Sequence, residues 1–369
     1  MPSVVPNVGG SLTGILCLVV TVWVVRIWRK RKAATVATED GAERQKFGKL
    51  SASTLVMLIE DDPVPHLVVD VRGPEERTAL PEVLGRASGG LLRAQVCELR
   101  GLFQRRSSSD LTQKNFTEVL PGKKAPRRDD LVVFVCETGE DSVKAVEEME
   151  AMGYSCAVYL DGGLASLRRQ TIQPARLKYI SRHAVAVLLN FVETPPPLDA
   201  QFIDVRRADE HTIFGTIEGS KFLNVNELPK ALRLDFNEFK SKYGFPKPKR
   251  DDVIVLNCRT NRRAKWGAAL CGEAGLQRAY VHRQGVHGWH FHPGVKMYDS
   301  YYQGDEIPKP RPFQIERPDV DAAWRELEDL GFGRRPTLPV PSFTSTATSS
   351  PFAGPDVDHG HRVAAAAQA

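Results

Sequence analysis

The amino-acid sequence predicts an α/β protein that contains two copies of one domain. Short runs of β-branched residues alternate with segments of helical periodicity, a pattern typical of parallel strands joined by crossover helices. The two copies are visible as an internal repeat, because residues 128–136 match residues 250–258 without a gap. The same register continues as far as Gly163 in the first copy and Gly285 in the second. With 369 residues, of which 42% are hydrophobic and 26% charged, the chain is long enough for two domains of ordinary size.

The N-terminal segment has the properties of a membrane anchor. No acidic, basic or histidine side chain occurs before Arg26, and residues 8–25 form an uncharged stretch that is just long enough to span a bilayer. Five cations then follow within residues 26–32, and the positive-inside rule predicts that they stay in the cytosol. We therefore predict a transmembrane helix at residues 8–28, with the bulk of the chain facing the cytosol. A buried helix and a cleaved leader are the alternatives, although a cleaved leader carries its positive charge before the apolar run. The short anchor with its basic flank is compatible with the mitochondrial outer membrane or the endoplasmic reticulum.

Composition and repeat boundaries predict how the rest of the chain is divided. The body carries no basic excess once the cluster near the anchor is set aside, so we expect no nucleic-acid partner. Small and polar residues predict a linker, and a segment rich in Pro, Ser, Thr and Ala predicts a disordered tail. The expected parts are a linker at 33–49, a first domain at 50–170, a second domain at 178–295, a C-terminal extension with a helix at 296–332, and a tail at 333–369.

Two cysteines occupy equivalent places in the repeat. Cys136 and Cys258 each follow a buried strand and precede a helix, and open α/β sheets bind their ligands at such strand ends. In each copy the expected order is strand, helix, strand. The expected ranges are 131–135, 143–152 and 156–160 in the first copy, and 253–256, 264–273 and 278–282 in the second.

The residues around the two cysteines have opposite charge. Cys258 is followed by cations, which together with the helix N-terminus favour a thiolate and attract anions, so we expect a lowered thiol pKa. Acidic residues follow Cys136 and predict a poor nucleophile that repels anions. The alternative for either cysteine is a small buried apolar residue without a chemical role. The flanking charges are Arg259, Arg262, Arg263 and Lys265 in the second copy and Glu137, Glu140 and Asp141 in the first.

These features together resemble the rhodanese-like sulfurtransferases over residues 50–168 and 179–291. The shared features are an Asp-Val-Arg strand end, a buried strand that leads to a cysteine, a six-residue loop that closes with Arg, and glycines after the next strand. The resemblance implies that Cys258 accepts sulfur from thiosulfate or a similar anionic donor, forming a persulfide that a thiol or cyanide then attacks. By the same resemblance Arg263 closes the loop and binds the anion. Arg259, Arg262 and Asn261 are then expected to contact substrate, and Asp204 and Arg206 to support the loop from the neighbouring strand.

The chain also departs from the family pattern. Asn261 stands where the family usually has Gly, and Ala264 where Ser or Thr is frequent. In the first copy Asp141 replaces the closing Arg, so we expect the first domain to be inactive. Dual-specificity phosphatases of the same fold have a loop one residue longer, so the position of Arg263, five residues after Cys258, favours a sulfur substrate.

Two expectations complete the prediction. Four histidines between 282 and 292 are not interleaved with carboxylates or thiols, so we expect neither a metal site nor a cofactor. An amphipathic helix around Trp324 is expected to pack on its own domain. The leading hypothesis is a membrane-anchored sulfurtransferase, and the alternative is a non-catalytic membrane-anchored scaffold or binding protein.

Overall fold

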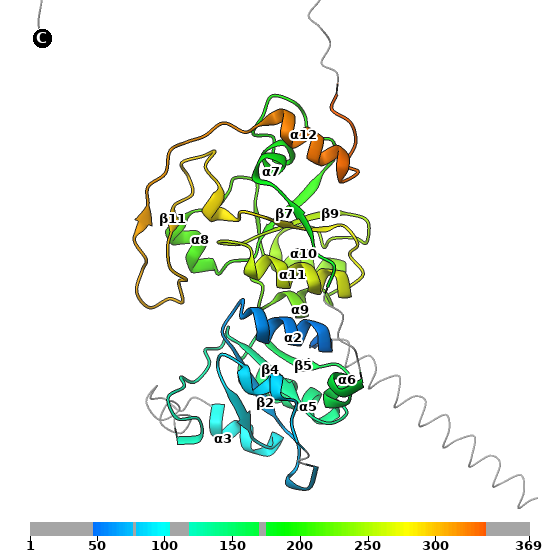
Figure 1. Cartoon of the computed structure of the whole chain (residues 1–369). Helices are drawn as coiled ribbons and strands as arrows, with labels where there is room; N and C mark the ends of the chain where they lie inside the picture. The colour runs from blue at the N-terminus through cyan, green and yellow to red at the C-terminus, as the bar shows by residue number, and fades with distance from the viewer. Residues whose placement is uncertain (1–46, 77–78, 104–117, 170–174, 337–369) are drawn as a thin grey trace, which may run out of the picture. The chain divides into compact units, whose positions relative to one another are not determined.

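The computed structural model describes residues 47–76, 79–103, 118–169 and 175–336. These residues contain two five-stranded sheets whose paired strands are all parallel, with helices on both faces (Figure 1). The strand order is β1-β5-β4-β2-β3 in the first sheet and β6-β10-β9-β7-β8 in the second, which is the same topology twice. The predicted α/β class and internal repeat are therefore confirmed.

The first sheet is built on strands rich in Val and Leu. Its central strands β2 and β4 are buried along their whole length, as expected for parallel strands covered on both faces. The five strands are β1 (Gly48–Leu50), β2 (His66–Asp70), β3 (Leu91–Arg93), β4 (Leu131–Val135) and β5 (Ala157–Leu160).

Alternate residues of these strands face two different layers of helices. In β4, Val133 and Val135 belong to the cluster that contains residues of α2 and α6, whereas Val132 and Phe134 belong to the cluster formed with α3 and α5. This period of two is what a pleated strand requires. The helices are α2 (Ala52–Asp61), α3 (Leu99–Phe103), α5 (Glu140–Ala151) and α6 (Gly163–Arg169), with short 3₁₀ turns η1 (Pro74–Glu76), η2 (Glu82–Arg86) and η3 (Val96–Glu98).

The second domain repeats this plan. Its strands are β6 (Lys178–Ile180), β7 (Ala200–Asp204), β8 (Lys221–Phe222), β9 (Val253–Asn257) and β10 (Ala279–His282). Its helices are α7 (Arg182–Leu188), α8 (Ala208–Phe214), α9 (Leu228–Ala231), α10 (Phe236–Tyr243) and α11 (Arg262–Glu273), with the 3₁₀ turn η4 (Val286–Gly288). Both helices after the cysteine loops begin earlier than expected, α5 at Glu140 and α11 at Arg262, because polar residues of the loop form the first helical turn.

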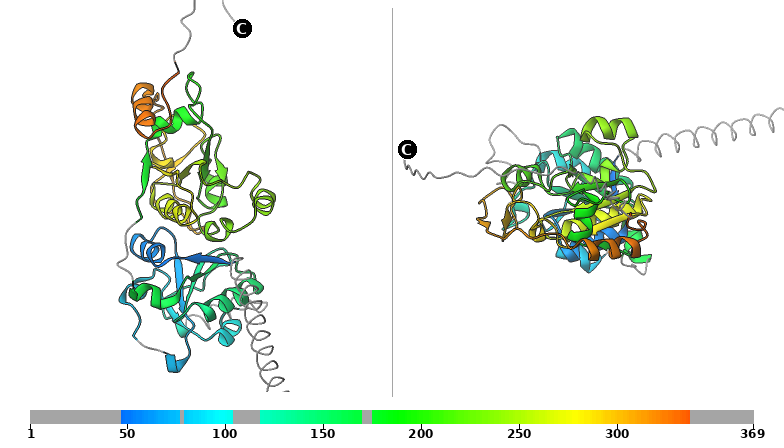
Figure 2. Two further views of the ribbon diagram at one scale, coloured as in Figure 1. Left: turned by 90° about the vertical axis from the view of Figure 1, so that its right-hand side faces the viewer. Right: turned by 90° about the horizontal axis from the view of Figure 1, so that it is seen from above.

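Helices α2 and α11 join the two domains. They lie side by side in Figure 2, and the fully buried Trp266 of α11 donates a hydrogen bond from Nε1 to the carbonyl oxygen of Thr54 in α2, at 3.2 Å. Leu55 and Leu58 of α2 share one hydrophobic cluster with Trp266 and with the β9 residue Leu256. One face of each sheet is thus buried in a core that both domains build, so the first domain supports the second.

The C-terminal extension folds onto the second domain. Strands β11 (Met297–Tyr298) and β12 (Pro310–Arg311) pair antiparallel, and helix α12 (Val320–Asp329) follows. Helix α12 buries Trp324 and Leu327 in the cluster that contains Val185 of α7, and its N-terminus is capped by Asp319. The expected packing of this helix on its own domain is confirmed.

Two boundaries differ from the prediction. The expected linker at 33–49 ends too late, because Gly48 and Lys49 already form β1 and pair with β5. The expected tail at 333–369 begins too early, because Arg335 bonds to the Asp321 carboxylate at 2.6 Å and to Glu328.

The predicted anchor at residues 8–28 lies outside the described residues, as does the chain from residue 337 onward. In the part of the chain that the structure describes, no helix has the length and apolar character needed to cross a membrane.

Candidate functional site

Cys258 lies directly after β9 and starts the loop that leads into α11. The loop is held from behind by η4, since the backbone N–H groups of Val286 and His287 donate to the carbonyl oxygens of Cys258 and Arg259, both at 2.8 Å. Gly285 precedes this turn with a φ of 61°, and a Cβ there would lie 2.3 Å from the carbonyl oxygen of Thr260. A glycine is therefore required at 285 for the turn to approach the cysteine loop so closely.

The thiol of Cys258 is buried, and this changes its expected acidity. Burial raises the pKa of the Cys258 thiol, and the Arg263 guanidinium and the backbone N–H groups of Arg263 and Ala264 offset only part of that rise. The lowered pKa expected from the sequence is therefore wrong in its net direction. Arg263 lowers the pKa of the Cys258 thiol, as expected, but the loss of solvent around the buried thiol raises that pKa by more.

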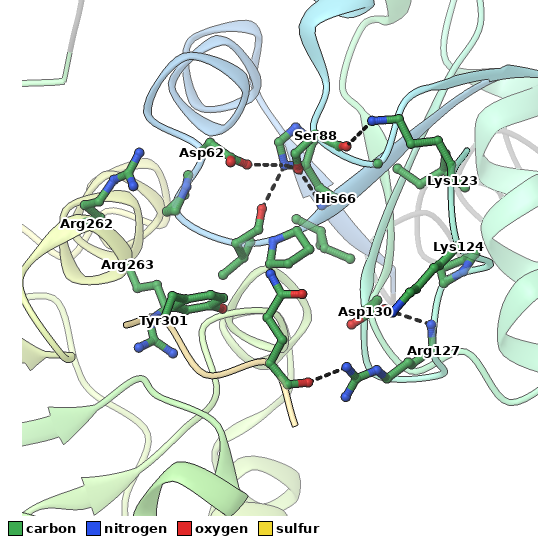
Figure 3. Close-up of a pocket in the computed structure, with 18 of the residues that line it drawn as sticks. Asp62, His66, Ser88, Lys123, Lys124, Arg127, Asp130, Arg262, Arg263 and Tyr301 are labelled. Carbon is green, nitrogen blue, oxygen red and sulfur yellow. Dashed lines mark hydrogen bonds and ion pairs between the residues drawn. The ribbon is translucent and has the colours of Figure 1, made fainter. Parts of the chain in front are cut away.

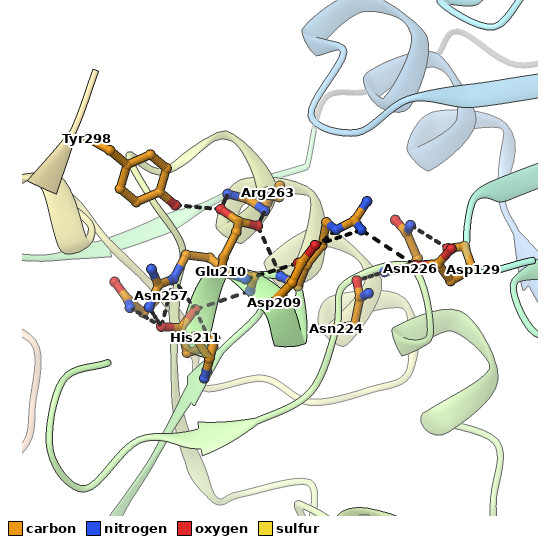
Figure 4. Close-up of polar contacts among 12 residues, drawn as sticks. Asp129, Asp209, Glu210, His211, Asn224, Asn226, Asn257, Arg263 and Tyr298 are labelled. Carbon is orange, nitrogen blue, oxygen red and sulfur yellow. Dashed lines mark hydrogen bonds and ion pairs between the residues drawn. The ribbon is translucent and has the colours of Figure 1, made fainter. Parts of the chain in front are cut away.

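Arg263 is paired inside the protein. Its Nη1 and Nη2 atoms bind the two carboxylate oxygens of Glu210 in α8, at 2.5 and 2.9 Å, and both side chains are buried (Figure 4). The Tyr298 hydroxyl donates to the same carboxylate at 2.5 Å, and the ring of Tyr301 lies 4.9 Å from the guanidinium. Burial raises the pKa of Glu210, but Arg263 and the Tyr298 hydroxyl lower it by more, so the net pKa lies below the usual value. The carboxylate therefore stays ionised and compensates the charge of Arg263.

The three residues expected to bind substrate also contact the chain itself. Arg259 Nη1 donates to the carbonyl oxygens of Tyr298 and Asp299, at 3.0 and 2.8 Å, and Asn261 Nδ2 donates to the carbonyl oxygen of Arg283 at 2.9 Å. Arg262 reaches the carbonyl oxygen of Asp61 in the first domain. These acceptors are neutral backbone groups, so the charges of Arg259 and Arg262 are not compensated there. Their role in binding substrate stays a prediction.

Asp204 and Arg206 lie beneath the loop. They form a fully buried ion pair with a 2.8 Å contact, and Asn257, the residue before Cys258, donates to Asp204 at 3.1 Å. Burial raises the pKa of Asp204, but the adjacent Arg206 and His211 take it well below its usual range. The structure thus brings the expected supporting residues into contact with the base of the loop.

Cys258 lines a cavity of about 530 Å³. Figure 3 shows part of its lining, with Lys124 and Arg127 on one side and Arg262 on the other. One wall comes from the second domain, from the cysteine loop and from Tyr301, Gln303 and Asp305, and the other comes from the first domain, from residues 62–67, 88–89, 122–127 and 130–131. Six cationic side chains and three carboxylates line it. The cationic residues are Lys123, Lys124, Arg127, Arg259, Arg262 and Arg263, and the acidic ones are Asp62, Asp130 and Asp305.

The first-copy loop has a different environment. Cys136 is buried and accepts a hydrogen bond from the N–H of Gly139 at 3.1 Å. The carboxylate of Glu137 lies beside Cys136 in the chain, 3.6 Å from Arg72 and in direct contact with Arg168. The Glu137 carboxylate thus already pairs with two cations beside this loop, Arg72 and Arg168.

The histidines between 282 and 292 do not converge on one point. His282 is buried, and its Nδ1 lies 2.9 Å from Asn257 Oδ1, whereas His290 pairs with Glu316 at 2.7 Å. His292 accepts from the backbone of Gly294. Across the described residues, no group of three or more His, Cys, Asp or Glu is placed to hold a metal ion.

Sequence reasoning missed two parts of the site. Glu210 pairs with Arg263 from 53 positions away, and Tyr298 donates to the Glu210 carboxylate from a segment 35 positions beyond Arg263; no local pattern marks either residue. The first-domain wall could have been suspected from the basic run around residues 123–128. Its position opposite Cys258 follows only from the packing of the two domains.

The fold and the site define a protein of two tandem α/β domains in which a strand-end cysteine loop, closed by arginine, faces a cationic cavity. A family model described as "Rhodanese-like domain" matches residues 51–170 and 186–292, and the chain belongs to this family.

Several relatives match about one domain of the chain. Rhodanese domain-containing protein CG4456 of Drosophila melanogaster is 32% identical over 97 residues, which are 26% of this chain and 87% of that protein. Thiosulfate sulfurtransferase/rhodanese-like domain-containing protein 3 of Mus musculus is 31% identical over 91 residues, or 25% of this chain and 58% of that protein. The solved structure of the human single domain sulfurtransferase TSTD1 is 27% identical, with a TM-score of 0.27, and covers 30% of this chain and 93% of its own.

Proposed function

We propose that this protein is a sulfurtransferase that carries sulfane sulfur on Cys258. The observation that carries the proposal is that Cys258, and not Cys136, lines the cationic cavity. Membership of the rhodanese-like family and the similarity to proteins named as thiosulfate sulfurtransferases support this assignment.

The reaction has two steps, and each conserves atoms and electrons. In the first step the Cys258 thiolate attacks the outer sulfur of thiosulfate, the bond between the two thiosulfate sulfurs breaks, and sulfite leaves with the electron pair. In the second step a thiolate or cyanide attacks the outer sulfur of the persulfide. The bond to Cys258 Sγ breaks, and Sγ recovers the electron pair as a thiolate. No external oxidant or reductant is needed.

The surrounding residues divide the remaining tasks. The backbone N–H groups of Arg263 and Ala264 favour the thiolate that each step requires. Arg259 and Arg262 supply uncompensated charge on the cavity wall for an anionic donor. Arg263 adds positive potential at the thiol, although Glu210 reduces its effect on an incoming anion.

The first domain acts as a non-reacting partner in this proposal. Glu137 places a negative charge next to Cys136, and Arg72 and Arg168 are already in contact with that carboxylate. An anionic donor would have to displace it before it could reach the thiol.

Mass spectrometry of the purified protein after incubation with thiosulfate tests the proposal. We expect one added sulfur atom on Cys258, none on Cys136, and turnover with cyanide that is lost in Cys258→Ser and kept in Cys136→Ser. Cys258→Ser and Cys136→Ser each remove a buried thiol at an equivalent strand end, so a general effect of losing a buried thiol should appear in both variants. If Cys258 stays unmodified by thiosulfate and by mercaptopyruvate, the proposal fails and the non-catalytic binding protein becomes the better description.

We also propose that residues 8–28 anchor the protein in a membrane with the two domains in the cytosol. The proposal rests on the uncharged run and on the basic cluster that follows it. The mitochondrial outer membrane and the endoplasmic reticulum are the two membranes to examine.

A further inference from the structure

Part of the cavity wall comes from a segment that lies outside the rhodanese-like domains. The match to the family model ends at residue 292, and the segment in question is residues 298–305 of the C-terminal extension. Three of its residues line the cavity, namely Tyr301, Gln303 and Asp305. After α6 the chain passes to β6, which belongs to the second sheet, so no equivalent segment follows the first domain among the described residues. Residues 298–305 therefore distinguish the Cys258 site from its counterpart in the first copy.

Contacts with both domains fix this segment in place. Near its start, Arg259 of the cysteine loop donates from Nη1 to the carbonyl oxygens of residues 298–299, at 3.0 and 2.8 Å. Near its end, Arg127 of the first domain donates to the carbonyl oxygen of Gln303. Tyr301 lies between these two attachment points, so its backbone is held on either side.

The ring of Tyr301 covers the guanidinium of Arg263. The ring centre lies 4.9 Å from the guanidinium carbon, and Figure 3 shows the two side chains against each other. This separation is within the range of roughly 6 Å over which a cation is attracted to an aromatic face. Glu210 binds both terminal nitrogens of the same guanidinium. The carboxylate thus holds the edge of this planar group, and the ring holds its face.

The position of Arg263 matters because its charge acts on the Cys258 thiol. Burial raises the pKa of that thiol, and among the influences that lower it the charge of Arg263 is the largest. The energy between two charges falls with distance, so a guanidinium that turned away would stabilise the thiolate less. Burial also raises the pKa of Tyr301, so its hydroxyl is uncharged at pH 7 and the ring adds no charge of its own beside the thiol.

We propose that Tyr301 is a positioning residue for sulfur transfer, and that its ring keeps the Arg263 guanidinium beside the Cys258 thiolate. The C-terminal extension would thereby contribute to the chemistry without touching the reacting atoms. The inference rests on the proposed function, because the thiolate concerned is the one that attacks the donor. Tyr301 takes no part in the bonds that form and break in that step.

Replacements of Tyr301 in the full-length protein test the proposal. Tyr301→Phe keeps the ring, whereas Tyr301→Leu and Tyr301→Met place an apolar side chain there without one. The rate of sulfur loading of Cys258 is measured over a range of thiosulfate concentrations. At saturating thiosulfate we expect a rate within about twofold of the unchanged protein in Tyr301→Phe, and a rate about fivefold lower in the two variants without a ring. The half-saturating concentration should change by less than about twofold, because Arg259 and Arg262 carry the uncompensated charge for the donor.

A second background separates positioning from a general effect on the cavity wall. In the variant that carries both Arg263→Met and Glu210→Leu there is no guanidinium to hold, so adding Tyr301→Leu should cause no further loss of loading. A further loss in this background would overturn the proposal, because Tyr301 would then act by another route.

Tyr179→Leu is the matched control. Tyr179 is also partly exposed, and its ring lies 5.6 Å from the guanidinium carbon of Arg283, but it is not among the residues that line the cavity. Its replacement should leave the loading rate unchanged. Cooperative unfolding in urea checks that each variant is folded, and either variant without a ring can stand in for the other if one does not fold.

Two results distinguish the failure of this inference from the failure of the proposed function. Equal loading rates in Tyr301→Phe and in a folded variant without a ring would overturn the positioning role alone. An equal loss in Tyr301→Leu and Tyr179→Leu would do the same. Loading of Cys258 in the unchanged protein is measured first, and its absence would overturn the proposed function itself.

Discussion

The buried ion pair between Arg263 and Glu210 allows structural support and chemistry to be separated. Arg263 is 3% exposed and Glu210 is fully buried, and their two contacts measure 2.5 and 2.9 Å. Replacing Arg263 with Met leaves the Glu210 carboxylate inside the protein without its cation. Breaking a buried pair in this way costs about 3–5 kcal/mol. That is a large part of the roughly 5–15 kcal/mol by which a protein of this kind is stable.

The double variant Arg263→Met with Glu210→Leu removes both charges. Because replacing a whole buried pair by apolar side chains is often close to neutral, we expect at least half of the lost stability to return. The recovery is incomplete, since the Tyr298 hydroxyl and the backbone N–H of Arg207 lose their acceptor. Sulfur loading of Cys258 should stay slow in the double variant, because the cation that lowers the thiol pKa is still missing.

Urea unfolding of all three variants, with Glu210→Leu as the third, completes the thermodynamic cycle, and mass spectrometry measures the rate of sulfur loading in each. A loss below about 1 kcal/mol in Arg263→Met would refute the buried, ionised pair, since an exposed pair contributes no more than that. Full sulfur loading in the double variant would show that Arg263 serves only to neutralise Glu210.

Three further predictions follow from the structure and the sequence. Because burial raises the pKa of Cys258, the rate of sulfur loading should rise about tenfold per pH unit between pH 7 and 8. The rate is measured by quenching the reaction at set times, and a lowered thiol pKa would instead give a rate that does not change with pH. His282 is buried, and its pKa falls to about 3; the unfolded chain therefore binds a proton near pH 6.5 that the folded protein does not, and stability should fall by about 2 kcal/mol as the pH drops from 6.5 to 5. His282→Gln should flatten this part of the urea-unfolding profile, and an unchanged slope would assign the effect to other groups. Deleting residues 1–32 should move the protein from the membrane fraction to the supernatant with both domains still folded, which a cooperative urea-unfolding transition checks, and release of the full-length chain by carbonate would contradict the anchor.

The repeat shows what can be inferred from local patterns. Strands β4 and β9 follow from continuous runs of Val, Ile and Leu, because strand formation there depends on residues adjacent in the chain. The approach of η4 to the cysteine loop was not predicted, because Gly285 meets Thr260, which lies 25 positions away in the chain. The family resemblance also implied that Asp204 and Arg206 support the loop, and the structure shows in addition that they form a buried ion pair with each other. The start of β1 was missed because three edge residues carry too short a pattern, and only the pairing with β5 makes them a strand.

The sequence by itself determined the two-copy α/β architecture and the contrast between the basic Cys258 loop and the acidic Cys136 loop, because strand periodicity and local charge are properties of consecutive residues. Only the tertiary structure decided the state of the site. The thiol pKa depends on how deeply Cys258 is buried, and the charge of Arg263 on a partner, Glu210, that lies far away in the chain. The wall opposite Cys258 comes from the first domain because α2 packs against α11 in a shared core. Burial, compensation of charge and the shape of a cavity are set by residues that meet only after folding, and the local sequence does not contain them.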